Sequence, residues 1–131
     1  AAIEARQMDG IFDDYVQAPM SQMVFNLLRE EARRDPYLAD EAHGVLDRSY
    51  AWLDRWMTGR EWAVGAAFGI ADCAAAAALF YAHWAYPIPE ACTALRAYRS
   101  RLLARPSVAR VVEEARPWRE NFPLKGDRSP D

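Results

Sequence analysis

Hydrophobic side chains recur every three or four residues along most of the chain, which is the spacing of one face of an α-helix. From Ile3 to Leu28 this pattern predicts one long helix or two helices in series. Pro19 lies inside the segment, and proline both lacks a backbone N–H and crowds the turn before it. We therefore expect a kink or a break near Gln17 and Ala18.

A second helix is predicted between Asp35 and Gly59, with Asp35 as its N-cap and Gly59 as its left-handed C-terminal stop. Gly44 falls inside this helix, where a glycine costs about 1 kcal/mol relative to alanine. That cost indicates a close approach of another helix at Gly44.

A third helix is predicted to begin at Gly69 and to continue to Trp84. Ten of the fourteen residues from Ile70 to His83 are Ala, Leu, Ile or Phe, so its surface is apolar nearly all round. A helix without a polar face belongs in the middle of a fold. We expect the other helices to pack around it, and its short alanine side chains would let them approach closely.

Two shorter helices are predicted after a proline-containing loop, the second beginning near Pro106. Beyond them we expect an extended tail in which Trp118 and Phe122 pack back on the body, and residues 126–131 are predicted to be frayed. We find no strand pattern of useful length. The sequence therefore predicts an all-α fold in which residues 1–125 form a single helical domain.

The composition is that of an ordinary globular protein, with 52% hydrophobic and 27% charged residues among 131. A net charge of −3 and a pI near 5.4 offer no basic field to a phosphate backbone, so nucleic acid is not an expected partner. The longest apolar stretch, Cys73 to Ala85, is well short of the roughly 20 residues that span a bilayer, so no membrane helix is predicted. The segment from Ala1 to Gln7 has neither an initiator Met nor a signal pattern and looks like the middle of a longer gene product.

The two cysteines and two histidines do not form a reactive or metal-binding group at any recognisable spacing, so no metal site is predicted. So few cysteines favour a reducing cytoplasm, and Cys73 is expected to be inert because it belongs to a buried helix. His43 and His83 are assigned to hydrogen-bonded interior or surface positions. Four tryptophans are assigned to the core or to the seat of another domain, namely Trp52, Trp56, Trp62 and Trp84.

The start of the third helix carries the most informative local pattern. With Gly69 as N-cap, Asp72 is the N3 residue, and its carboxylate can accept a hydrogen bond from the Gly69 N–H as half of a capping box. Phe68 and Cys73 then occupy the two positions of a hydrophobic staple. A buried helix start has unpaired N–H groups and no water to bind them, so a carboxylate there supplies an acceptor and a favourable charge. We assign Gly69 and Asp72 a structural role.

On these residues, the sequence resembles the C-terminal, all-helical domain of bacterial-type cytosolic glutathione transferases. The family signature is a glycine, then an aromatic residue, a Ser or Thr, an aliphatic residue, Ala and Asp at the start of the central helix, and the segment from Trp62 to Asp72 matches it. Further matches are Ala97-Tyr98-x-x-Arg101 and Ala104-Arg105-Pro106-Ser107, so the resemblance covers nearly the whole chain. Gly69 departs from the pattern, because the family has Ser or Thr there; as an N-cap, glycine is only a few tenths of a kcal/mol worse.

The resemblance implies a role within a larger enzyme. In the family, this helical domain walls the site of the electrophilic second substrate, forms much of the dimer interface and seats an N-terminal thioredoxin-like domain, which binds glutathione and activates its sulfur. No βαβ pattern of such a domain occurs in the 131 residues. We therefore expect the fragment alone to be inactive. Its parent would be a homodimeric glutathione transferase that conjugates glutathione to apolar electrophiles, or that carries out a related reductase, isomerase or peroxidase reaction.

The resemblance also implies that the first helix carries the residues that face the substrate. On that analogy the candidates for substrate binding are Tyr15, Pro19, Met20 and Met23, since a surface rich in Met and aromatic residues adapts to varied apolar ligands. Ordinary packing in the core is the alternative for the two methionines and for the tyrosine. Asp13 lies near the position from which some members of the family reach across the dimer to the amino group of glutathione, and a solvated helix face is its alternative role.

Two other functions stay open. The same helical domain also serves as a non-catalytic assembly or dimerisation module attached to translation factors and synthetases. A ligand-sensing domain of a transcription regulator would also have an apolar central helix, but its basic helix-turn-helix segment is missing here. A thioredoxin-like reading frame before Ala1 would favour the enzyme, and a gene that begins near Ala1 would favour the assembly module.

Overall fold

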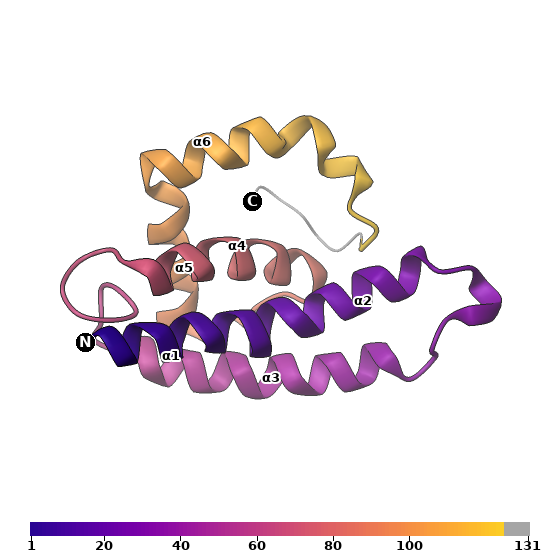
Figure 1. Cartoon of the computed structure of the whole chain (residues 1–131), viewed down its shortest axis with the longest axis horizontal. Coiled ribbons are helices and arrows are strands. Elements are labelled where there is room, and N and C mark those ends of the chain that lie inside the picture. Colours follow the sequence, from indigo (N-terminus) through magenta and orange to yellow (C-terminus); the bar gives the residue numbers. More distant parts are fainter. Residues whose placement is uncertain (125–131) are drawn as a thin grey trace.

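The computed structural model describes residues 1–124, and these residues form an all-helical fold, as predicted. The elements in chain order are α1 (Ala2–Phe12), η1 (Asp13–Gln17), α2 (Ala18–Leu28), η2 (Glu31–Arg33), α3 (Leu38–Met57), α4 (Ile70–Ala85), α5 (Thr93–Ala104), α6 (Pro106–Ala115) and η3 (Arg116–Asn121). Figure 1 shows α1, η1 and α2 as one long rod with α3 running back along it, α4 on the other side of the rod and α6 on the far side of α4. The predicted fraying of residues 126–131 falls outside the described residues.

The interruption expected just before Pro19 is a π-helical turn and not a break. Because Pro19 has no N–H, the Tyr15 carbonyl four residues earlier loses its usual helical partner. The Ser49 hydroxyl of α3 donates to that carbonyl at 2.7 Å instead. The Ala18 N–H meanwhile donates to the Asp13 carbonyl five residues back, which is the π-helical pattern. The rod therefore stays continuous, and α3 is fastened to it at this turn.

The loop before α3 replaces the helix start that the sequence predicts at Asp35. α3 begins at Leu38, and the Asp35 carboxylate accepts from the Tyr37 N–H at 2.9 Å within the loop. The Asn26 side chain both accepts from the Asp35 N–H and donates to the Asp35 carbonyl, each at 2.9 Å. These two bonds tie the loop to the end of α2, so the helix starts later than its N-cap signal indicates.

The two glycines singled out in the second predicted helix behave differently. Gly59 has a φ of 75°, which is the left-handed conformation predicted for the end of α3. At Gly44, an added Cβ would meet only the Arg48 Nη1 of the same helix, at 3.5 Å. The expected close helix contact at Gly44 is therefore wrong.

The hydrophobic core lies between α4 and the rod of α1, η1 and α2, with α3 and α5 closing its other sides. Polar side chains of α3 fasten the later segments to this core. The Asp54 carboxylate accepts from the Leu95 N–H near the start of α5 at 2.9 Å, and the buried Tyr50 hydroxyl donates to the Tyr86 carbonyl after α4 at 2.8 Å. Burial raises the pKa of Tyr50 and keeps its hydroxyl protonated.

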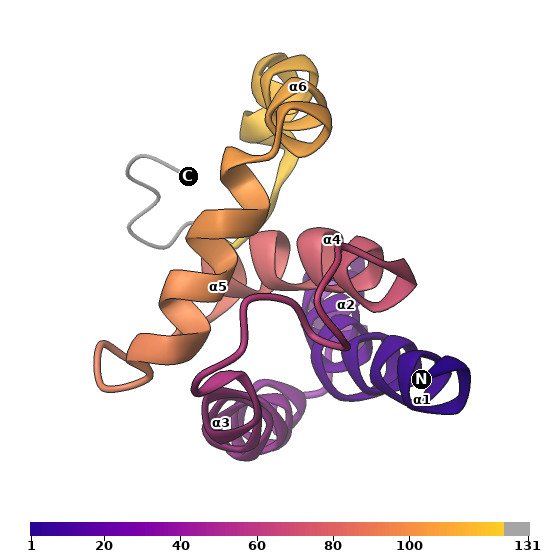
Figure 2. The same cartoon turned by 90° about the vertical axis from the view of Figure 1, so that its left-hand side faces the viewer.

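Helix α6 stands apart from this core, as Figure 2 shows, and is joined to it through α5. None of its residues is buried, and Val111 is 58% exposed. The segment after it is a 3₁₀ helix where the sequence predicts an extended tail. Phe122 does pack back, on Tyr81 and Trp84 of α4, but Trp118 is 69% exposed, so that part of the prediction is wrong. Trp118 belongs to the 3₁₀ helix that follows α6, outside the hydrophobic core, so most of its ring stays uncovered.

Candidate functional site

The start of α4 is fastened by the buried carboxylate of Asp72, which is 1% exposed. Its Oδ2 accepts from the Gly69 N–H at 2.8 Å, and its Oδ1 accepts from the Ala63 N–H at 2.9 Å and from the Tyr98 hydroxyl at 2.5 Å. Gly69 has no side chain to complete the capping box, and its carbonyl accepts from the Asp72 N–H at 3.1 Å. One carboxylate thus joins the loop before α4, the first turn of α4 and the middle of α5.

The surroundings of this buried cluster keep the Tyr98 phenol protonated. Burial, followed by the hydrogen bond to Asp72, raises the pKa of Tyr98, so the phenol stays a donor to the carboxylate. The carboxylate already accepts three hydrogen bonds and lies away from solvent. Because its acceptors are used by groups of the chain itself, Asp72 holds the fold together and is not exposed to a substrate.

Arg99 and His83 make the polar contacts of the second half of α4 and of the loop that follows it. The buried Arg99 donates from its Nε to the Leu79 carbonyl at 3.1 Å and from its Nη2 to the Phe80 carbonyl at 3.3 Å. His83 accepts from the Ile88 N–H through its Nδ1 at 3.0 Å. Burial, together with the charges of Arg99 and Arg96, lowers the pKa of His83 to about 4, so this imidazole is neutral near pH 7.

A cavity of about 250 Å³ lies between α2, α4, α6 and η3, and we call it the aromatic cavity. Its principal lining residues are Val24, Leu28, Tyr81, Trp84, Trp118 and Phe122. The Phe122 ring lies 5.7 Å from that of Tyr81 and 5.6 Å from that of Trp84, so the three rings form one wall. The Arg119 guanidinium lies over the Trp84 ring at 4.7 Å and adds a positive charge beside this wall. Aromatic walls with one charged group are typical of sites for small apolar ligands.

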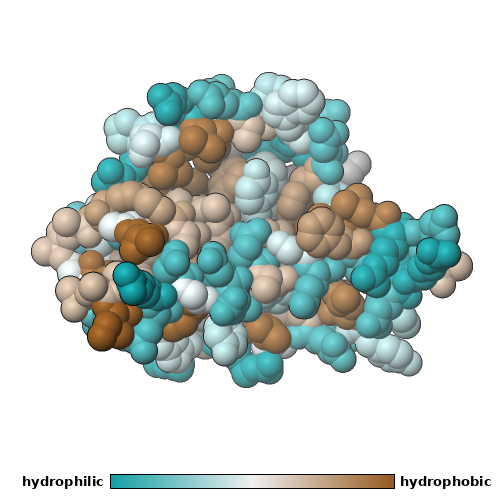
Figure 3. All heavy atoms as spheres, in the orientation of Figure 1, coloured by the Kyte–Doolittle hydropathy of each residue, from teal (hydrophilic) through white to brown (hydrophobic). Residues whose placement is uncertain are grey.

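A second hollow, which we call the α4–α6 groove, continues from the aromatic cavity along α4 and has a volume of about 340 Å³. Its floor is formed by Cys73, Ala76 and Ala77 of α4, and Val108 and Val111 of α6 form the facing wall. Figure 3 shows apolar side chains gathered in the hollow beneath α6. Cys73 is exposed here, so the expectation that it lies buried is wrong.

A third hollow, the α1–α3 hollow, lies on the opposite side of the rod and has a volume of about 380 Å³. Ile11, Tyr15, Arg48 and Trp52 line it, and Trp52 is 39% exposed. The Trp52 ring stacks on that of Trp56 at 5.4 Å with an interplanar angle of 12°. This face therefore presents a rigid aromatic surface to its surroundings.

The structure does not bring the predicted substrate residues together. Tyr15 is 57% exposed and lines the α1–α3 hollow, whereas Pro19, Met20 and Met23 are buried within the core. Asp13 is exposed at the start of η1. The binding roles of these five residues stay predictions, and Met20 and Met23 make the core contacts that were the alternative for them.

The sequence analysis missed the wall formed by Tyr81, Trp84 and Phe122. A signal for part of it was present, because Phe80, Tyr81 and Trp84 follow one another at helical spacing near the end of α4. The position of Phe122 beside them depends on the path of the chain through α5 and α6. Local pattern carries no information about that path.

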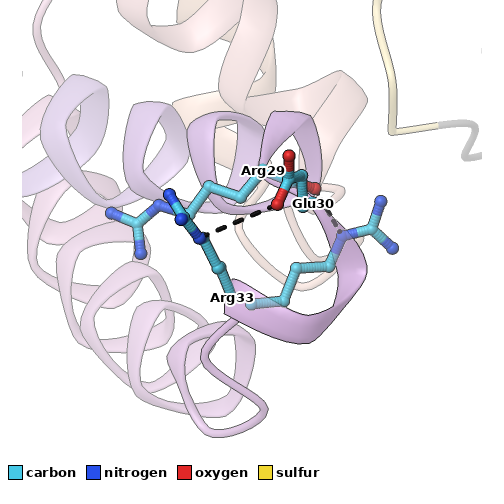
Figure 4. Close-up of polar contacts among 4 residues, drawn as sticks. Arg29, Glu30 and Arg33 are labelled. Carbon is cyan, nitrogen blue, oxygen red and sulfur yellow. Dashed lines mark hydrogen bonds and ion pairs between the residues drawn. The ribbon is translucent and has the colours of Figure 1, made fainter.

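Other charged groups in the described part of the chain do not assemble into a reactive site. At the turn after α2, the Arg33 Nε lies 3.7 Å from the Glu30 carboxylate, with both side chains about four-fifths exposed (Figure 4). Such solvated pairs contribute about 0–1 kcal/mol. Within residues 1–124 no group of three or more His, Cys, Asp or Glu could hold a metal ion. Over the same residues, the helices lack the length and continuous hydrophobicity needed to cross a membrane.

Comparison with known proteins agrees with this architecture. The family described as glutathione S-transferase, C-terminal domain, matches residues 16–106, which is more than half of the chain. The fold is similar to the crystal structure of a glutathione S-transferase from Methylobacterium radiotolerans in complex with glutathione sulfonate, with a TM-score of 0.68 and 25% identity. That similarity covers 82% of this chain and 52% of the other, so this chain spans about half the length of that relative. No curated protein sequence matches the chain. With the family matched over that span and the helical arrangement shared, the chain belongs to the family of glutathione S-transferase C-terminal domains.

Proposed function

We propose that this chain is the helical, substrate-binding half of a glutathione transferase-like enzyme that conjugates glutathione to apolar electrophiles in the cytoplasm. The observation that carries the proposal is the aromatic cavity, with its wall of Tyr81, Trp84 and Phe122. Its rings offer large, rigid surfaces that bind flat apolar molecules at a small entropic cost. Family membership supplies the reaction class.

Glutathione itself would be bound by a companion thioredoxin-like domain, as the co-substrate of the whole protein. Two features support this division of labour. The structural relative, which is in complex with glutathione sulfonate, is about twice as long as the part that aligns with this chain. The buried acid of this chain's central helix, Asp72, accepts hydrogen bonds from two backbone N–H groups and a tyrosine and is therefore not available to a thiol. Asp13 remains our candidate for a contact with glutathione across a dimer.

The test is a kinetic comparison in the full-length gene product, assayed against a panel of apolar electrophiles. Trp118→Ala removes a ring that lines the cavity but is 69% exposed, so the fold should survive. We expect the KM for the electrophile to rise by about three- to tenfold, which corresponds to about 1 kcal/mol of lost binding, while the KM for glutathione stays unchanged.

Phe25→Ala is the matched control, because Phe25 is a 64% exposed ring of α2 outside the aromatic cavity. It should change neither KM. An equal effect of the two substitutions, or no effect of Trp118→Ala, would remove the aromatic cavity from the substrate site.

We also propose that the whole protein is a homodimer that uses the α1–α3 hollow. An exposed aromatic centre, with Tyr15 and Trp52, is flanked there by acidic Asp14 and basic Arg48, which is a mixture of charges that a two-fold interface can pair. Trp52→Arg should shift the protein toward the monomer in sedimentation velocity, and Phe25→Arg should not. This assignment would be contradicted if the full-length protein sediments as a monomer, or if Trp52→Arg leaves its dimer unchanged.

The second candidate is a non-catalytic assembly module, and the open α4–α6 groove favours it, since uncovered apolar grooves serve as docking sites. The panel of electrophiles separates the two functions. Conjugation by the full-length protein that depends on Trp118 supports the enzyme. A full-length protein without any conjugating activity would support the assembly module.

A further inference from the structure

The charged side chains that line the aromatic cavity are all positive in the described part of the chain. They are Arg116 and Arg119, and the amide of Asn121 lines the cavity with them. The other lining residues are apolar or aromatic. The chain as a whole carries a net charge of −3, so this local excess of positive charge does not follow from composition. It favours a molecule in the cavity that brings a negative charge.

The 3₁₀ geometry of η3 places these side chains. Residues three positions apart lie on the same face of a 3₁₀ helix. Arg116, Arg119 and Phe122 have that spacing, and all three line the cavity. The Arg119 guanidinium lies over the Trp84 ring, with its Cζ 4.7 Å from the ring centre, and Trp84 belongs to the same wall as Phe122. A cation and an aromatic wall are therefore held together by one short helix.

The two arginines differ in their surroundings. Arg116 pairs with Glu113, a carboxylate outside the cavity lining, and 41% of the Arg116 side chain is exposed. Arg119 is half-buried and lies on the face of an indole ring, which attracts a cation. Apolar surroundings weaken an electrostatic interaction less than water does. Arg119 is therefore the better placed of the two to bind an anion inside the cavity.

The size and the walls of the cavity indicate a small, flat ligand. Its volume of about 250 Å³ lies below the roughly 300–1,000 Å³ of pockets that hold drug-sized molecules, so one or two aromatic rings would fill it. The rings of Tyr81 and Phe122 are inclined by only 29° to each other. The Trp84 ring meets them at 85° and 69°. A flat ring can stack on one of these surfaces and meet another edge to face.

We propose that the aromatic cavity selects a small aromatic carboxylate, whose ring lies against Tyr81, Trp84 and Phe122 and whose carboxylate is bound by Arg119. A guanidinium can donate two parallel hydrogen bonds to a carboxylate, so this pair fixes the orientation of the ring as well as adding affinity. The inference rests on the proposed function for the assignment of the cavity as the substrate site, and it adds the charge of the substrate.

Two matched ligands test the charge preference in the full-length protein. Naphthalene-2-carboxylate and naphthalene-2-carboxamide have the same rings and nearly the same shape, and only the first is charged at neutral pH. Neither ligand is an electrophile for a thiol, so titration calorimetry measures binding without conjugation. We expect the Kd of the carboxylate to be at least about tenfold lower than that of the amide.

Arg119→Gln and Arg110→Gln form the matched pair of variants, because each removes one positive charge. Arg110 is an exposed residue of α6 outside the cavity lining, where it pairs with Glu114 at 3.8 Å. Arg119→Gln should raise the Kd of the carboxylate about tenfold and leave that of the amide unchanged, whereas Arg110→Gln should change neither. Arg119→Lys keeps the charge without the planar fork and should retain part of the preference.

Two further variants locate the ligand. Trp118→Ala removes a ring from the cavity lining and should raise the Kd of both ligands about three- to tenfold. Phe25→Ala, whose ring lies outside the cavity, should change neither Kd. A carboxylate that binds equally well to the Trp118→Ala protein occupies another site, and that result would overturn the inference.

The outcomes separate this inference from the proposed function. Equal affinity of the wild type for the two ligands, or no binding of either, would overturn the inference even if conjugation occurs. Equal weakening of both ligands by Arg119→Gln would also overturn it, because Arg119 would then only support the Trp84 ring. A preference for the carboxylate that Arg119→Gln alone removes supports the inference, whether or not the electrophile panel shows conjugation.

Discussion

The two sides of α4 have nearly the same composition and opposite surroundings. One side, with Ala71, Ala75, Ala78 and Leu79, is 0–2% exposed and packs on α1, η1 and α5. The other side carries Cys73, Ala76 and Ala77 and forms the floor of the α4–α6 groove. An alanine is therefore a core residue on one side of this helix and a surface residue on the other. The comparison teaches that the apolar composition of a helix does not by itself decide which of its sides is covered.

The largest effect is expected at the carboxylate that fixes the buried side. Asp72→Ala leaves the Ala63 and Gly69 N–H groups and the Tyr98 hydroxyl without their acceptor in a dry site. We expect the free energy of unfolding to fall by about 3–5 kcal/mol in urea titrations.

Asp47→Ala is the control for that substitution, because Asp47 is exposed and accepts a single hydrogen bond, from the Tyr86 hydroxyl. It should cost about 1 kcal/mol or less. Comparable losses for the two variants would contradict the view that Asp72 holds the centre of the fold.

A matched pair of leucine substitutions compares the two sides of α4 directly. Ala78 is 1% exposed in the core, so Ala78→Leu overpacks it and should lower the free energy of unfolding by about 1–3 kcal/mol. Ala77→Leu points into the groove and should change the stability of the 131-residue chain by no more than about 0.5 kcal/mol. Thermal and urea unfolding of the two variants measure the difference. Equal costs would mean that the groove is already filled.

His83 should give α4 a pH-dependent contribution. Its pKa is lowered from 6.5 to about 4 by burial and by Arg99 and Arg96, so between these values the unfolded chain binds a proton that the folded chain does not. Stability from this group is complete above about pH 6.5 and is lost as the pH falls toward 4, by about 1 kcal/mol after allowance for solvent screening.

His83→Gln should therefore flatten the pH dependence of the unfolding free energy between pH 4 and 6.5 relative to the wild type, measured at a series of pH values. His43→Gln, which changes the other histidine and leaves His83 in place, is the matched control. An unchanged profile for His83→Gln would show that the imidazole does not resist protonation in the folded protein.

The smallest effect concerns the residue that departs from the family signature. Gly69 has an extended backbone, with φ −141° and ψ −166°, and an added Cβ would have its nearest contact 4.0 Å away, at the Ala67 carbonyl. Gly69→Ser should fit and should stabilise the fold by a few tenths of a kcal/mol, because the hydroxyl can accept from the Asp72 N–H. A calorimetric melting temperature that falls instead would show that this position has no room for the family's usual residue.

Local rules predicted the parts of the fold that depend on near neighbours in the chain. The helical spacing, the left-handed stop at Gly59 and the hydrogen bond from the Gly69 N–H to Asp72 all involve groups within a few residues of one another. At Pro19 the sequence predicted that one backbone hydrogen bond is lost, but it did not predict which group would replace the missing N–H. The replacement comes from Ser49, which lies 30 positions further along the chain.

The candidate site was harder to predict than the fold. The sequence left Met20 and Met23 open between a substrate surface and the core; both are buried in the core, and their role in substrate binding stays a prediction. From the same helix, Val24 and Leu28 line the aromatic cavity. A shift of one position along a helix rotates a side chain by about 100°, so neighbouring positions of α2 have different surroundings.

The sequence by itself determined that this chain is helical, where most of its helices lie and that Asp72 begins the central one, because hydrogen bonding and capping act over a few residues. Tertiary structure alone decided that α6 leans away from α4, that Phe122 completes an aromatic wall and that Cys73 lies in the open. These features depend on which apolar faces are covered by other helices, and this is decided by packing between segments far apart in the chain.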